Sequence, residues 1–78
     1  MKLELYKEAA FTRDMPECGI KKGDVATVID YLTDPEPGYT LEVFDAFGNT
    51  VDVLSVPEYY MEAIVKGERF QVRQFEIA

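Results

Sequence analysis

Few side chains in this sequence could do chemistry, because the chain has no histidine and a single serine, Ser55. Histidine is the usual general base at neutral pH and the commonest metal ligand. The carboxylates of Glu42 and Asp52 could act as an acid and a base, but such a pair needs a cleft that separates their pKa values. A small β-domain with a filled interior offers little room for one. We therefore expect no catalytic residue and no enzyme activity.

The only thiol, Cys18, lies in the segment Pro16-Glu17-Cys18-Gly19, whose composition is typical of a turn. Reactive cysteines need electropositive surroundings that stabilise the thiolate. Glu17 has the opposite effect, and Lys21 and Lys22 lie close enough in sequence to offset only part of it. We interpret Cys18 as a bystander thiol. A single cysteine also excludes an internal disulfide.

Three acidic residues, Asp30, Asp34 and Glu36, lie close together in sequence. They lack the glycine-centred ligand spacing of a calcium-binding loop. We interpret them as solvated loop acids, and we expect neither a metal site nor a cofactor.

The net charge of −7 comes entirely from the middle of the chain. Residues 23–65 contain nine acidic residues and no lysine or arginine, whereas both ends are slightly basic. Proteins that bind DNA or RNA draw most of their affinity from basic side chains on phosphates. The charge pattern therefore predicts no nucleic-acid binding and favours a basic protein partner.

β-Strands must position these residues, because apolar and polar side chains alternate along much of the chain. Pro35 and Pro37 exclude a strand between 34 and 38, and the segment 45–49 is typical of a hairpin loop. The 78 residues suffice for one all-β domain, a small barrel of about five antiparallel strands. We expect strands over residues 3–12, 25–32, 39–43 and 50–53. The predicted core residues are Val25, Val28, Tyr39, Leu41, Val43, Val51 and Val53.

The last third of the sequence allows two interpretations. Ser55 and Glu58 match a helix capping box, and Pro57 suits a first helical turn. One helical turn could cover residues 57–60, or a longer helix could reach Gly67. A barrel favours the single turn, followed by a closing strand over 61–65. Residues 1–64 would then form the domain, and 65–78 an extension in which Glu68–Ile77 could add a strand.

The outer face of the central hairpin is the candidate partner-binding face. If Asp45 lies opposite Asn49, then Val43 faces Val51, Leu41 faces Val53, and Glu42 faces Asp52 on the outer side. Phe44, Leu54 and Val56 could share that side, unless a bulge turns Leu54 or Val56 inward. The face predicted to bind a partner comprises Glu42, Phe44, Asp52 and Leu54.

Residues 15–28 resemble the opening signature of a family of small, largely uncharacterised bacterial proteins that is common in cyanobacteria. The matching run is Met15-Pro16-Glu17-Cys18-Gly19-Ile20-Lys21-Lys22-Gly23-Asp24-Val25-Ala26-Thr27-Val28. The family pattern is Leu-Pro-x-x-Gly-Leu-x-x-Gly-Asp-x-Gly-Thr-Val, from which Ala26 departs by replacing a glycine. Residues 38–45, Gly48 and 51–57 resemble its second half. The resemblance covers about residues 3–64 and implies an SH3-like barrel related to ribosomal KOW-type modules.

Family members can lie beside genes for toxins, so the resemblance implies toxin neutralisation as one role. Our first hypothesis is a non-catalytic module that binds a basic protein, with an antitoxin or immunity-like role. The alternative is an assembly protein that self-associates through the C-terminal strand, so a monomer and a homodimer both remain open. No apolar run reaches the roughly 18 residues of a membrane helix, and residues 1–4 lack a signal peptide's apolar stretch. We expect a soluble, cytoplasmic protein with no membrane partner.

Overall fold

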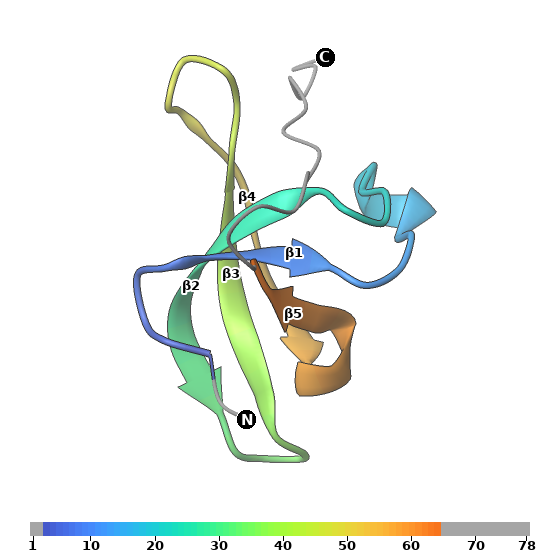
Figure 1. Cartoon of the computed structure of the whole chain (residues 1–78), viewed down its shortest axis with the longest axis vertical. Coiled ribbons are helices and arrows are strands. Elements are labelled where there is room, and N and C mark those ends of the chain that lie inside the picture. Colours follow the sequence, from blue (N-terminus) through green and yellow to red (C-terminus); the bar gives the residue numbers. More distant parts are fainter. Residues whose placement is uncertain (1–2, 65–78) are drawn as a thin grey trace.

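The computed structural model describes residues 3–64, and in them the chain is all-β (Figure 1). Two single turns of 3-10 helix, η1 (Pro16–Cys18) and η2 (Glu58–Tyr60), interrupt five strands. The strands are β1 (Glu8–Phe11), β2 (Val25–Leu32), β3 (Gly38–Phe44), β4 (Thr50–Pro57) and β5 (Met61–Ala63). The predicted all-β class, the five antiparallel strands and the short helical turn after the fourth strand are confirmed.

The strands form one antiparallel sheet in the order β4-β3-β2-β1-β5. The sheet is strongly curled, so that β1 crosses the direction of β3 in Figure 1. Within residues 3–64, β4 and β5 are the two edges and no backbone ladder joins them. The sheet is therefore open, and its likeness to SH3-like barrels stays a prediction.

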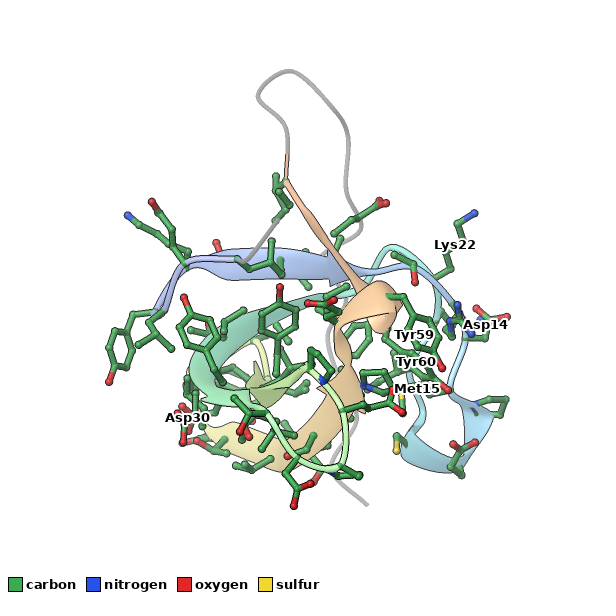
Figure 2. All side chains as sticks on the ribbon, turned by 90° about the horizontal axis from the view of Figure 1, so that it is seen from below. Asp14, Met15, Lys22, Asp30, Tyr59 and Tyr60 are labelled. Atoms are coloured by element: carbon green, nitrogen blue, oxygen red, sulfur yellow. The ribbon has the colours of Figure 1, made fainter. Side chains whose placement is uncertain are left out.

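Strand β2 covers the predicted residues 25–32, where β-branched side chains favour an extended backbone. The turn before it also forms as predicted. Gly23 has a φ of 92°, which glycine adopts without strain. The amide of Asp24 donates to the carbonyl of Lys21 at 2.9 Å, and the Asp24 carboxylate accepts from the Lys21 amide at 2.9 Å. The side chains of Asp14 and Lys22 lie beside this turn, far from Asp30 (Figure 2).

The first strand is shorter than predicted, because the chain turns at Leu5 and Tyr6 before β1 begins at Glu8. Tyr6 has a φ of 63°, and its amide donates to the carbonyl of Val28 at 2.6 Å. Leu3 and Leu5 nevertheless pack against the core. Leu3 and Leu5 alternate because both are buried against the sheet, and not because they belong to a strand. The prediction of a strand that begins at residue 3 was therefore wrong.

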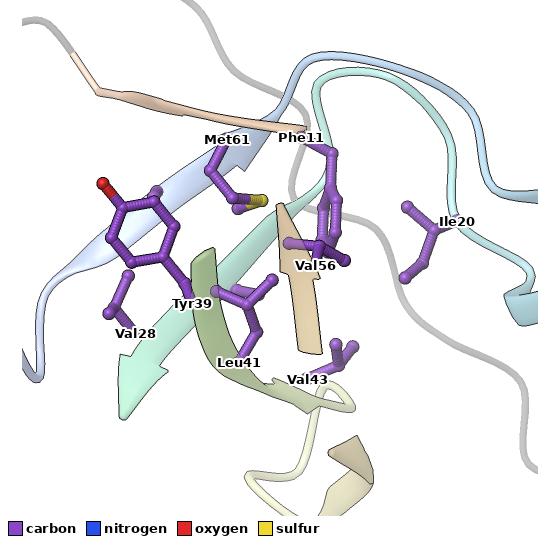
Figure 3. Close-up of a cluster of buried hydrophobic side chains, with 10 residues drawn as sticks. Phe11, Ile20, Val28, Tyr39, Leu41, Val43, Val56 and Met61 are labelled. Carbon is purple, nitrogen blue, oxygen red and sulfur yellow. The ribbon is translucent and has the colours of Figure 1, made fainter. Parts of the chain in front are cut away.

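The core fills the concave side of the curled sheet. In Figure 3, Phe11 and Met61 lie on one side of it and face Leu41 and Val56 on the other. Of the predicted core residues, Val28, Tyr39, Leu41 and Val43 are buried, whereas Val25 is only half-buried. The buried apolar residues are Ala9, Phe11, Ile20, Ala26, Val28, Tyr39, Leu41, Val43, Val56 and Met61.

Val51 and Val53 were wrongly predicted to lie in the core, because the observed β3–β4 register differs by one residue from the predicted one. The loop closes as predicted, with the amide of Asp45 donating to the carbonyl of Asn49 at 2.9 Å. Phe44 pairs with Thr50, but Val43 then pairs with Asp52, which leaves Val51 as an extra residue in β4. A one-residue slip moves side chains to the opposite face. Leu41 accordingly pairs with Leu54 and Glu42 with Val53.

Replacing Val43 by alanine tests this register together with the core. Val43 is 1% exposed, so its truncation should lower the free energy of unfolding by about 2–3 kcal/mol through lost burial and a residual cavity. Val53 is 52% exposed, and Val53→Ala should change it by less than about 0.5 kcal/mol. Chemical denaturation measures both variants. Equal losses of unfolding free energy would show that both valines point inward, as the register predicted from the sequence requires.

The chain after β4 forms one helical turn rather than a helix reaching Gly67. The prediction of a helix capping box was wrong. Ser55 belongs to β4, and its hydroxyl lies 3.0 Å from the hydroxyl of Thr40. Pro57 precedes η2, which has no side-chain cap. The closing strand expected over 61–65 is β5, Met61–Ala63. Val65, the extension 65–78 and the strand proposed over Glu68–Ile77 lie outside the described residues.

Candidate functional site

The structure divides the predicted partner-binding face between the two sides of the hairpin. Glu42 and Phe44 alternate with buried residues of β3 and therefore lie on its outer side. Asp52 and Leu54 pair with the buried residues Val43 and Leu41, which places them on the inner side of β4. The predicted contact between Glu42 and Asp52 does not form.

Leu54 and Glu42 have partners that differ from the predicted ones. Leu54 packs against the core, as the bulge alternative allowed. Glu42 accepts a hydrogen bond from the hydroxyl of Thr50 at 2.6 Å. Because Glu42 and Asp52 do not face each other, neutralising both is not expected to stabilise the fold by relieving repulsion.

Four large apolar side chains of the β3–β4 hairpin are exposed to solvent, and we call them the hairpin cluster. Phe47 at the tip is 89% exposed and Val53 is 52% exposed, while the other two are exposed by a little more than a third. Single apolar residues on a surface are normal, but four exposed ones on a single hairpin favour an interaction site. The hairpin cluster comprises Phe44, Phe47, Val51 and Val53.

Sequence reasoning missed three members of the hairpin cluster. Phe47 was assigned only to the hairpin loop, and Val51 and Val53 were placed in the core. For Phe47, the available signal was an aromatic residue between the turn residues Asp45 and Gly48. For Val51 and Val53 no signal existed, because the extra residue in β4 does not disturb the alternation of apolar residues.

The hairpin tip is held in one conformation by Asp45. Its carboxylate accepts from the amide of Phe47 at 2.8 Å, the amide of Asn49 at 2.9 Å and the side-chain amide of Asn49 at 3.3 Å. Gly48 completes the turn with a φ of 83°. These bonds fix the backbone that presents Phe47 to solvent.

The same hydrogen bonds lower the pKa of Asp45, with the bond from the Asn49 amide as the largest cause. Asp45 should therefore stabilise the fold above its unfolded pKa of about 4, and this contribution should fade as the pH falls through the lower folded value. In denaturation experiments, the difference in unfolding free energy between the native chain and Asp45→Asn should shrink in acid. A difference that is constant from neutral pH to about pH 2 would contradict this linkage.

Within residues 3–64, strand β4 is an edge of the sheet, and it carries Val51 and Val53 of the hairpin cluster. Among the described residues β4 pairs with β3 alone. The amide of Val53 donates to the Asp52 carboxylate at 2.8 Å, so a neighbouring side chain caps it. Asp52 thus lies at the sheet edge rather than on the outer face with Glu42.

Cys18 is half-buried in η1 and packs against the core. Burial raises the pKa of the Cys18 thiol, and the charges of Glu17 and Asp52 raise this pKa further. A protonated thiol at neutral pH agrees with the interpretation of Cys18 as a bystander.

Alkylation of Cys18 can report where Asp52 lies. Removing its charge with Asp52→Asn should lower the Cys18 pKa and speed the reaction with iodoacetamide at a fixed, mildly alkaline pH. Glu42→Gln, a matched loss of one charge on the outer face, should leave the rate unchanged. A faster reaction in both variants, or in neither, would argue against the observed register.

A second cluster joins the segment after β1 to η2. The Arg13 guanidinium lies 4.9 Å from the ring centroid of Tyr59 and 4.3 Å from that of Tyr60, within the range of cation–π attraction. The Thr12 hydroxyl donates to the carbonyl of Tyr59 at 2.8 Å. Figure 2 shows both tyrosines at the end of the molecule that carries Asp14 and Lys22. These contacts fasten η2, and we assign them a structural role.

The described residues contain no group of three cysteine or acidic side chains arranged to hold a metal ion. In residues 3–64 no helix has the length and apolar character needed to cross a membrane.

In residues 3–64 the fold and the candidate site define a small all-β domain with an exposed apolar hairpin and with β4 at one edge of the sheet. The chain belongs to the family described as a domain of unknown function, DUF4926, whose model matches residues 5–63. This match spans all five strands. Searches of curated proteins and of solved structures gave no match. The predicted membership of a family without assigned function is confirmed, while the signature motif and the bacterial origin stay predictions.

Proposed function

We propose that this domain is a non-catalytic protein-interaction module that binds a basic protein through the β3–β4 hairpin. The observation that supports this proposal best is the hairpin cluster, with Phe47 89% exposed on a tip that Asp45 holds in place. A backbone that is already held in place loses less conformational entropy on binding than a flexible loop would. Burying Phe47 and Val53 would remove apolar surface from water, which favours association.

The charge around the hairpin determines the kind of partner. Glu42, Asp45 and Asp52 belong to the stretch of residues 23–65 that has nine acids and no lysine or arginine. Acidic side chains around an apolar anchor attract a basic surface and raise the association rate. Neutralising them should lower the association rate more than it raises the dissociation rate.

The loss of the aromatic anchor should weaken partner capture strongly. Phe47→Ser should weaken binding about 30-fold, the effect of losing an interface residue worth about 2 kcal/mol. Stability should change by less than about 0.5 kcal/mol, because Phe47 has little packing to lose. Affinity capture from the native lysate with quantitative mass spectrometry, followed by titration of the captured protein, measures this effect.

Tyr6→Ser is the matched control, because Tyr6 is a 74% exposed aromatic residue far from the hairpin in sequence. It should capture the same proteins as the native chain. High salt should reduce capture by the native chain, since screening weakens exposed charges. If Phe47→Ser retains every protein that the native chain captures, the hairpin is not the binding surface.

The charge pattern supports further parts of this proposal. We infer no affinity for DNA or RNA at physiological salt, because the middle of the chain lacks phosphate-neutralising side chains. A basic partner is consistent with an antitoxin or immunity-like role in the cytoplasm. The alternative, self-association through a C-terminal strand, depends on residues outside the described ones.

A further inference from the structure

We propose that the edge of the sheet formed by β4 in residues 3–64 binds an extended, lysine- or arginine-bearing segment of the partner as an additional strand. This inference rests on the proposed function and specifies its partner. The hairpin cluster would supply the anchor, and the β4 edge would supply main-chain hydrogen bonds. The chemistry of the partner follows from three features of this edge.

The first feature is the direction of the β4 backbone. The Val53 amide bonds to a side chain of its own strand, so it points away from β3. Every second residue of an antiparallel strand has the same orientation, which places the amide of Ser55 on the open side as well. Such a row of groups is a template for strand addition. Pro57 has no amide and marks the end of the row.

The second feature is the cap on Val53. The Asp52 carboxylate accepts the hydrogen bond of the Val53 amide, which an incoming strand's carbonyl would need to accept instead. A lysine or arginine on the incoming segment can take this carboxylate in a charge-assisted hydrogen bond, which is stronger than a neutral one. The amide is then released for pairing. A segment without a cation would leave the cap in place, so the edge selects for basic residues.

The third feature is a shallow hollow at the carboxyl end of β4. Apolar side chains form most of its wall, and Glu36 adds an acidic group. An added strand turns alternate side chains to each face of the sheet, so one of them can enter this hollow. The hollow favours an apolar or basic side chain there. Its lining residues are Leu32, Pro35, Glu36, Ser55, Val56 and Pro57.

The experiment uses the full chain labelled with nitrogen-15 and a short synthetic peptide of alternating lysine and valine. On titration, the amide signals of Val53 and Ser55 should shift and become protected from hydrogen exchange. The same peptide with glutamate in place of lysine should bind at least about 10-fold more weakly, since like charges oppose docking. A peptide N-methylated at alternate amides should also lose binding, because it cannot pair as a strand. Equal binding of the N-methylated peptide, or shifts confined to residues away from β4, would overturn the proposal.

Two variants sharpen the result. Val53→Pro removes the edge amide, a change that edge strands tolerate where the amide faces solvent, and should abolish peptide binding. Val53→Thr keeps the amide and should retain it. If the proline variant does not fold, Asp52→Asn remains informative, because loss of the carboxylate should weaken binding of the lysine peptide. Unchanged binding in Asp52→Asn would exclude the proposed role of the cap.

The outcomes separate this inference from the proposed function. If Phe47→Ser abolishes lysate capture while Val53→Pro affects neither capture nor the lysine peptide, the hairpin binds a partner and the edge proposal fails. If the chain alone sediments as a dimer that Val53→Pro dissociates, the edge binds a second copy, and the proposal of a basic partner strand is wrong.

Discussion

Phe11→Ala is expected to lower the free energy of unfolding by about 3–5 kcal/mol, the range for truncating a buried phenylalanine. Phe11 is fully buried and lies in β1 opposite Met61 of β5. Its amide donates to the carbonyl of Asp24 at 2.8 Å, and its carbonyl accepts from the amide of Gly23 at 2.8 Å. The ring therefore fills the core from a backbone that is held on two sides, which limits collapse around the cavity.

Such a loss would consume much of the stability of a 78-residue domain, about 4–12 kcal/mol in total. Urea denaturation followed by circular dichroism should show the unfolding midpoint of Phe11→Ala at a much lower urea concentration than that of the native chain. Phe47→Ala is the matched control, because it removes the same ring from a position that is 89% exposed. It should change stability by less than about 0.5 kcal/mol. A loss below about 1 kcal/mol for Phe11→Ala would mean that this ring is not central to the core.

Gly38→Ala should have the second-largest effect, a loss of about 3 kcal/mol at the upper end of the usual cost of overpacking. A Cβ at Gly38 would lie 2.3 Å from the carbonyl oxygen of Val56 and 3.4 Å from the Cα of Pro57. Both atoms belong to the backbone of β4, which can give way only if the whole strand shifts. The hydrogen bonds between β3 and β4 would then weaken at the end of the ladder where Gly38 pairs with Pro57.

Thermal and chemical denaturation would measure this loss. Gly48→Asn is the control, since nothing lies within 4 Å of a Cβ there and asparagine tolerates the left-handed backbone. It should cost less than Gly38→Ala. Unchanged stability in Gly38→Ala would show that β3 and β4 leave room for a Cβ at Gly38, contrary to the distance of 2.3 Å from that Cβ to the Val56 oxygen.

The elements predicted best were those determined by local residues. Strand β2 follows from its β-branched side chains, and the turn before it follows from Gly23 and Asp24. The hairpin loop closes as expected because Asp45 and Asn49 provide its hydrogen bonds within a few residues.

The elements predicted worst depend on contacts that periodicity does not report. Val51 is an extra residue in β4, and no local signal distinguishes it from an ordinary strand position. Leu3 has the spacing of a strand residue, yet the hydroxyls of Tyr31 and Tyr39 bind its backbone. Those tyrosines come from strands about thirty residues away in sequence.

The candidate site was predicted in part. Glu42 and Phe44 lie on the outer side of the hairpin as expected, whereas the bulge moves Asp52 to the edge and Leu54 towards the core. The outer side of the hairpin therefore keeps Glu42 and Phe44, while Val53 lies opposite Glu42 in the place predicted for Asp52.

The position of β1 between β2 and β5 also has a consequence for biosynthesis. Ala9 of β1 pairs with Ala63 of β5, so β1 cannot complete its hydrogen bonds until β5 has left the ribosome. Strands β2, β3 and β4 are neighbours in both sequence and sheet, and they can pair while the chain is still growing. Met61 covers the core only after β5 has been synthesised. The nascent domain should therefore present part of its apolar interior, Phe11 included, until residues 61–63 emerge from the exit tunnel.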